Sequence, residues 1–123
     1  MSWKYEIYRA VLVAFGTLQT ILNLYYLSRA DGMKLAARQH TELPKNATMK
    51  QLKIKTTMML LFGVIFLAGG LYAYFTHSFP KSIVFAIVIG FALYAIIEAL
   101  YYRYWKTVGF AIVGVLLAAV LIV

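Results

Sequence analysis

The stretch that decides the fold is Thr56–Phe75, TTMMLLFGVIFLAGGLYAYF, a run of 20 residues without a charged side chain. An α-helix of this length is about 30 Å long, which matches the thickness of the hydrocarbon core of a membrane. The residues of a soluble helix are not apolar on every face, whereas those of a membrane span are. The stretch therefore predicts a transmembrane helix.

Three further runs have the same character, and they cover residues 10–27, 82–102 and 107–123. The connections at 76–81 and 103–106 are short, so the spans on either side of each connection must run antiparallel. We therefore predict an all-α fold, a four-helix transmembrane bundle in which residues 1–123 form a single domain.

The composition agrees with a membrane protein. Hydrophobic residues make up 63% of the chain and charged residues 13%, and the mean hydropathy is +0.80, whereas soluble domains are about 25% charged. The chain has no cysteine, which excludes disulfides and thiolate metal sites. Its net charge of +8 does not indicate nucleic acid binding, because the basic residues flank the apolar runs instead of forming a basic groove with stacking aromatics.

The distribution of lysine and arginine predicts the orientation. The long loop 28–55 and the linker 103–106 hold nine basic residues, whereas the opposite side holds Lys4, Arg9 and Lys81. Basic loops stay in the cytoplasm, so we expect both termini outside a plasma membrane of the bacterial type. The loop is also expected to contact anionic lipid headgroups through its basic residues, which are Arg29, Lys34, Arg38, Lys45, Lys50, Lys53 and Lys55.

The long loop contains signals for two helix starts. Asp31 is an expected N-cap for a short amphipathic helix over Met33–Leu43, which should stop before Pro44 because proline disfavours helix at the preceding residue. Further on, Thr48 and Gln51 fit a capping box. The second span is therefore predicted to begin near residue 49, ahead of its apolar part.

The loop also carries His40-x-Glu42. Two ligands are too few for a metal site, and residues two apart point to different faces of a helix. We therefore predict a solvated histidine at the membrane surface and no metal or other cofactor.

The pattern Arg38-x-x-x-Glu42-x-Pro44 resembles the basic, carboxylate and proline motif of the membrane-associated eicosanoid and glutathione metabolism family. Proteins of that family are small, have four spans and bind glutathione at trimer interfaces. The resemblance implies an enzyme of lipid or glutathione metabolism.

Four polar residues lie inside the predicted spans: Gln19 and Asn23 in the first, and Tyr94 and Glu98 in the third. Each pair is spaced i, i+4 and so shares one helix face, and the two pairs lie at matching depths. We predict an Asn23–Glu98 and Gln19–Tyr94 ladder. Such a cluster is either inter-helix hydrogen bonding or the binding site of a substrate, ion or lipid headgroup.

No motif of a known catalytic class occurs in the chain. The sequence therefore favours a non-catalytic accessory, immunity, partner-binding or lipid-binding subunit, acting as a homo-oligomer or with a partner membrane protein. A small oligomeric transporter or channel that uses the four intramembrane polar residues is the first alternative. The membrane enzyme implied by the resemblance is the second.

Overall fold

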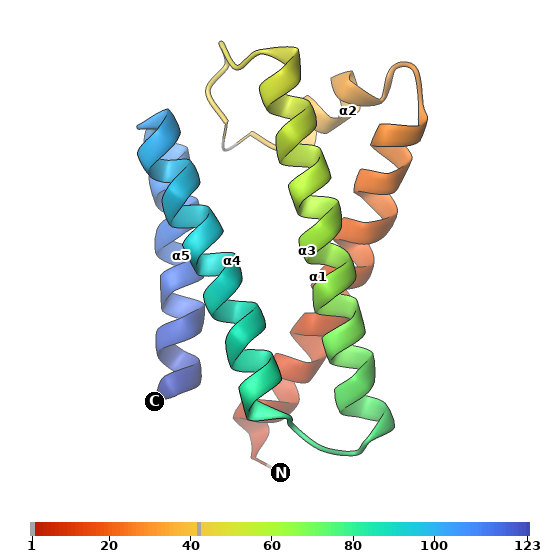
Figure 1. Ribbon diagram of the computed structural model, residues 1–123, viewed down its shortest axis with the longest axis vertical. Helices are drawn as coiled ribbons and strands as arrows, with labels where there is room; N and C mark the ends of the chain where they lie inside the picture. The colour runs from red at the N-terminus through yellow and green to blue at the C-terminus, as the bar shows by residue number, and fades with distance from the viewer. Residues whose placement is uncertain (1, 42) are drawn as a thin grey trace.

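The computed structural model describes residues 2–41 and 43–123. These residues form five helices and no strand, and four of the helices are long and apolar enough to cross a membrane. Those four are α1, α3, α4 and α5 (Figure 1). The elements are α1 (Trp3–Ser28), α2 (Gly32–Gln39), α3 (Met49–Phe75), α4 (Lys81–Tyr102) and α5 (Trp105–Ile122). The predicted four-helix bundle is confirmed. Each predicted span lies within one helix, apart from Val123 at the end of the fourth span.

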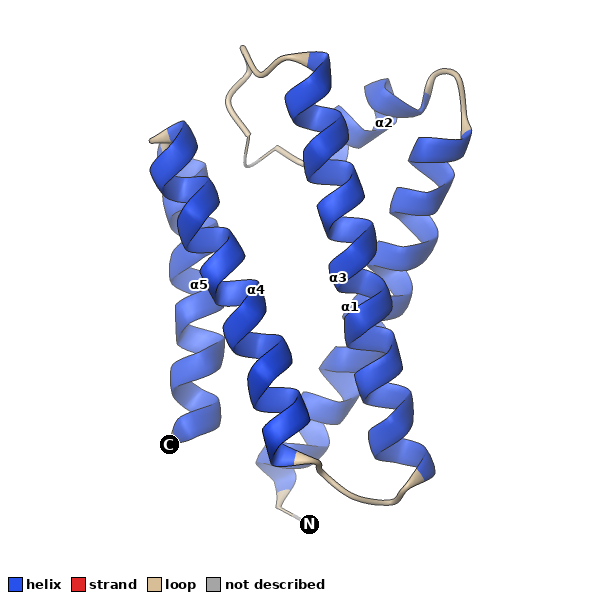
Figure 2. Cartoon of the chain, in the orientation of Figure 1, coloured by secondary structure: helices blue, strands red, loops and turns tan. Residues whose placement is uncertain are grey.

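The spanning helices form two antiparallel pairs. Helix α1 packs along α3 and helix α4 packs along α5, whereas α3 and α4 approach each other over a shorter stretch. Both chain ends lie at one end of the bundle, and α2 lies at the other end against α1 and α3 (Figure 2). We call these ends the terminal end and the loop end.

The structure agrees to different extents with the two helix starts predicted in the long loop. The capping box is confirmed, since Gln51 N donates to Thr48 Oγ1 (3.1 Å) and Thr48 N donates to Gln51 Oε1 (2.9 Å). Helix α2, in contrast, ends at Gln39 and not at Leu43, because the backbone turns away at His40 (ψ 59°). Asp31 does not cap it with its side chain, because its carboxylate accepts a hydrogen bond from Arg29 Nε at 3.1 Å.

Small residues allow the helices of each pair to approach closely. A Cβ atom on Gly63 of α3 would lie 2.8 Å from the backbone nitrogen of Thr20 on α1, and a Cβ atom on Gly16 would overlap the backbone at Leu67. In the other pair, a Cβ atom on Gly114 would lie 3.3 Å from Ala92 Cα. Close backbone approach of this kind is a main source of packing energy between membrane helices.

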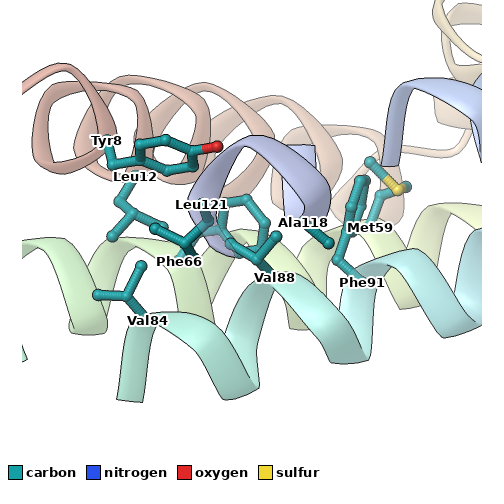
Figure 3. Close-up of a cluster of buried hydrophobic side chains, with 9 residues drawn as sticks. All are labelled: Tyr8, Leu12, Met59, Phe66, Val84, Val88, Phe91, Ala118 and Leu121. Carbon is teal, nitrogen blue, oxygen red and sulfur yellow. The ribbon is translucent and has the colours of Figure 1, made fainter. Parts of the chain in front are cut away.

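The core lies where the two helix pairs meet. Its buried apolar side chains come from all four spanning helices (Figure 3) and are Tyr8, Leu12, Met59, Phe66, Val84, Val88, Phe91, Ala118 and Leu121. Phe91 is central, because its ring lies 5.3 to 5.9 Å, centroid to centroid, from four other phenylalanine rings. We name these five rings the phenylalanine cluster: Phe15, Phe62, Phe66, Phe91 and Phe110.

Candidate functional site

The two helix pairs are joined by a buried ion pair. Lys55 Nζ on α3 lies 2.8 Å from Glu98 Oε1 on α4, and the two side chains are only 1% and 4% exposed. Taking both charges out of water is costly, and good geometry is needed to offset that cost. The pair is therefore a strong constraint on how α3 and α4 meet.

Neighbouring groups stabilise both charges. The Tyr94 hydroxyl donates to Glu98 Oε2 at 2.7 Å, so both carboxylate oxygens are hydrogen-bonded. Lys55 Nζ lies 4.1 Å from the centroid of the Phe110 ring on α5 and 5.3 Å from that of Tyr94. Aromatic faces attract cations, so three helices contribute to this centre.

A cavity of about 330 Å³ opens beside the ion pair, and we name it the α3–α4 cavity. Its lining residues are Gln51, Ile54, Lys55, Tyr94, Ile97, Glu98, Tyr101 and Tyr102. Ile54 and Ile97 are 53% and 65% exposed at the mouth of this cavity, on helices long and apolar enough to cross a membrane. The cavity thus combines an aliphatic entrance with a charged inner wall.

Towards the middle of the bundle this centre borders the phenylalanine cluster. The Phe62 ring lies 5.3 Å from the Tyr94 ring, and Phe62 in turn packs 5.4 Å from Phe91. Because these rings fill the space between the helix pairs, the polar centre is confined to the loop end.

The predicted Asn23–Glu98 and Gln19–Tyr94 ladder is wrong. Asn23 Nδ2 donates to the backbone oxygen (2.7 Å) and to Oε1 (2.8 Å) of Gln19 on its own helix, while Glu98 bonds to Lys55 and Tyr94. Helix α1 packs on α2 and α3, and α4 packs on α3 and α5. The hydrogen bonds among residues 2–41 and 43–123 therefore place Gln19 with Asn23, and Tyr94 with Glu98.

His40 completes the group around Asn23. Its Nε2 lies 2.8 Å from Asn23 Oδ1, and only 3% of its surface is exposed. The backbone oxygen of Gln19 can only accept, so it orients the Asn23 amide with Oδ1 towards the histidine, and His40 Nε2 is the donor. The prediction of a solvated histidine is wrong, because the turn after α2 directs the ring inwards.

The basic loop residues divide into two sets. Lys55 was expected to contact headgroups, but its buried pairing with Glu98 contradicts this. Six are exposed, and their contact with headgroups stays a prediction: Arg29, Lys34, Arg38, Lys45, Lys50 and Lys53. Among the exposed groups, the Arg29 guanidinium lowers the pKa of the Asp31 carboxyl through a hydrogen bond and charge attraction.

The structure of Glu42 lies outside the described residues, and so does the His40-x-Glu42 pair. Within residues 2–41 and 43–123, no three metal-ligating side chains come together. Of the residues in the family-like motif, Arg38 is exposed on α2 and Pro44 lies in the loop before α3.

Sequence reasoning missed the partner of Glu98. A signal was present: Lys55 and Glu98 carry opposite charges, and both lie near the loop ends of consecutive antiparallel spans. Helical spacing around Glu98 offers no cation, because its partner is 43 residues away.

Comparisons with known proteins found no matching family model, no similar curated protein and no similar solved structure. The fold and the site therefore indicate a general class of protein, and they do not assign the chain to a known family. The chain is a small multi-pass membrane protein with four spanning helices and a charged centre between its helix pairs.

Proposed function

We propose that this protein is a non-catalytic, lipid-binding subunit of the plasma membrane that takes an amphiphilic molecule into the α3–α4 cavity. One observation carries the proposal: a cavity entered past exposed isoleucines has a buried ion pair in its wall. This arrangement offers apolar surface to a hydrocarbon chain and charged or hydroxyl groups to its polar end.

The size and lining of the cavity support this ligand class. Small-molecule sites are mostly apolar, have a few placed polar groups, and measure about 300–1,000 Å³. At about 330 Å³ the cavity has room for one headgroup or one chain segment, with the remainder of the molecule in the bilayer. Gln51 and Tyr101, which share a hydrogen bond of 3.4 Å, supply neutral polar groups near the ion pair.

The ion pair itself also supports a binding role. Apolar residues of similar volume often replace a buried ion pair without loss of stability, so stability alone is a weak reason to keep one. Charged groups inside a membrane span are, in general, candidates for function. Lys55 and Glu98 form part of the wall of the α3–α4 cavity, so a bound molecule would lie against this wall.

The exposed basic residues support the orientation within this proposal. Six of them lie on α2, on the loop residues and on the first turns of α3. Each basic residue near an anionic surface contributes about 1 kcal/mol of attraction. With this end in the cytoplasm, the α3–α4 cavity opens in the inner leaflet.

Transport is a second candidate, favoured by the intramembrane ion pair, since such pairs occur along ion and substrate pathways. For a single copy this role requires the phenylalanine cluster to open, because its rings fill the space between the helix pairs. A flux assay in sealed vesicles tests it. Flux that is lost in the double variant Lys55→Met with Glu98→Leu, which removes both charges together, would favour transport over binding.

The lipid-binding proposal is tested by blocking the cavity entrance. Ile97→Trp places an indole at the entrance, and Leu93→Trp is the matched control, because Leu93 is 55% exposed one turn earlier on α4 and does not line the cavity. Native mass spectrometry of protein released from lipid nanodiscs measures the retained lipid.

We expect Ile97→Trp to lose one retained lipid that the parent protein and Leu93→Trp keep. Equal retention by all three would contradict the proposal. A membrane protein that copurifies in stoichiometric amount and is lost in Ile97→Trp would instead identify the occupant as a partner helix.

A further inference from the structure

A second cavity lies at the terminal end of the bundle, far from Lys55 and Glu98. It measures about 460 Å³ and is formed where the start of α1, the start of α4 and the end of α5 meet. We name it the terminal cavity, and its lining residues are Tyr5, Lys81, Ser82, Phe85, Leu121 and Ile122.

Two ammonium groups lie close to the polar side of this cavity. Lys81 Nζ is 5.2 Å and Lys4 Nζ is 5.4 Å from the centroid of the same ring, that of Tyr5. Lys4 also donates to the backbone oxygen of Val120 at 3.4 Å, which holds it beside the end of α5. Two like charges near one ring repel each other, and an anion between them would relieve that repulsion.

The acidic residue at this end is already engaged. Arg9 Nη2 donates to both oxygens of Glu6 at 2.9 Å, and this guanidinium is mostly buried. Glu6 therefore neutralises Arg9 and leaves the charges of the two lysines available to an external anion.

The Tyr5 ring is fixed in place. It stacks on Phe79 with a centroid distance of 4.3 Å and an interplanar angle of 13°. The position of the ring that both lysines approach is thus set before any ligand arrives, and such preorganisation lowers the cost of binding.

The rest of the cavity is apolar and faces the lipid. Phe85 is 40% and Ile122 is 64% exposed, while Leu121 is nearly buried beneath them. Phe85 lies about one turn after Lys81 on α4, in the direction of the hydrocarbon, where a lipid chain would run. A soluble phosphate ester would leave this surface uncovered, so the cavity fits a lipid better.

We propose that the terminal cavity binds the phosphate group of an anionic phospholipid, with Lys81, Lys4 and the Ser82 hydroxyl around the phosphate and an acyl chain against Phe85 and Ile122. This site is independent of the α3–α4 cavity, because it lies at the other end of the bundle and shares no lining residue with it.

The test measures lipid retention by native mass spectrometry from nanodiscs of phosphatidylglycerol or phosphatidylcholine. The variants are Lys81→Gln, Lys4→Gln and Ser82→Ala. Lys106→Gln is the matched control, because Lys106 is also in the first turn of a spanning helix and also lies near an aromatic ring, but at the loop end.

We expect the parent protein to retain phosphatidylglycerol in preference to phosphatidylcholine. Each lysine variant should weaken this retention about fivefold, the equivalent of about 1 kcal/mol per basic residue near an anionic headgroup. Ser82→Ala should weaken it less, and Lys106→Gln should leave it unchanged. Ile97→Trp should lose one lipid in both kinds of nanodisc and so leave the preference for phosphatidylglycerol unchanged, which separates this site from the α3–α4 cavity.

Three results would overturn the proposal: equal retention of both lipids, a loss in Lys106→Gln as large as in Lys81→Gln, or full displacement of the lipid by soluble glycerol phosphate. Thermal unfolding of each variant is measured in parallel. If Lys81→Gln lowers the melting temperature, the result from Lys4→Gln decides, because Lys4 is not among the residues of the hydrophobic core.

Discussion

Lys55 and Glu98 form a 2.8 Å ion pair between two helix pairs that otherwise approach each other over a short stretch. The pair lies at the loop end, and the phenylalanine cluster lies deeper in the bundle. Because the pair and the cluster link the same two units, the stability of the assembled bundle depends on both.

Glu98→Gln should therefore destabilise the bundle. It removes one partner of a buried ion pair, a change that costs about 3–5 kcal/mol in other proteins. The double variant Lys55→Met with Glu98→Leu removes both charges. Its free energy of unfolding should lie within about 1 kcal/mol of that of the parent protein or exceed it. Equilibrium unfolding in detergent measures both. A Glu98→Gln protein as stable as the parent would mean that the pair contributes nothing to assembly.

The His40–Asn23 bond gives a second prediction. Gln at position 40 can place a donor near the position of Nε2, so His40→Gln should retain most of the stability. His40→Leu leaves the buried Asn23 oxygen without its donor and should cost about 1–3 kcal/mol. Neither variant should change the metal content measured by elemental analysis; stoichiometric zinc that disappears in His40→Leu would show that the histidine is a ligand.

Close packing of α1 on α3 gives a third prediction. Gly63→Ala forces the Cβ atom against the Thr20 backbone, and overpacking of this kind costs about 1–3 kcal/mol. Gly109→Ala is the control, because a Cβ atom there would meet no heavy atom within 4 Å among the described residues. Thermal unfolding should show a lower melting temperature for the first variant and an unchanged or higher one for the second. Equal effects of the two variants on the melting temperature would mean that the close packing of α1 on α3 contributes little to stability.

The orientation is tested by single cysteines, which are unambiguous because the chain has none of its own. An impermeant maleimide added to intact cells should label Ser2→Cys and Ser78→Cys, which lie at the terminal end, and should not label Asn46→Cys in the basic loop. Permeabilised cells should label all three. The reverse pattern would place the basic loop outside and move the α3–α4 cavity to the outer leaflet.

The helices were predictable from the sequence because length and hydropathy act locally. The start of α3 was predictable for the same reason, since Thr48 and Gln51 bond within one turn. Which helices pack against each other was not predictable, because equal depth in a membrane does not determine which helices touch. Asn23 and Glu98 lie at similar depths, yet α3 takes the place beside α1.

Two predictions were wrong because each treated a polar residue beside an apolar segment or a short helix as exposed. Lys55 precedes the apolar run at Thr56 by one residue, and His40 directly follows the short helix α2. Each is buried because a partner on another helix satisfies it, Glu98 for the lysine and Asn23 for the histidine. Such partners are set by tertiary packing, which local patterns do not report.

The division of the bundle into two helix pairs has a consequence for its biogenesis. During synthesis α1, α2 and α3 leave the ribosome before α4 and α5, and the first pair contains both sides of its glycine contacts and of the His40–Asn23 bond. We therefore expect assembly to be a docking of two preformed hairpins. A chain severed in the turn between Phe75 and Lys81, and coexpressed as two fragments, should reassemble into the same bundle.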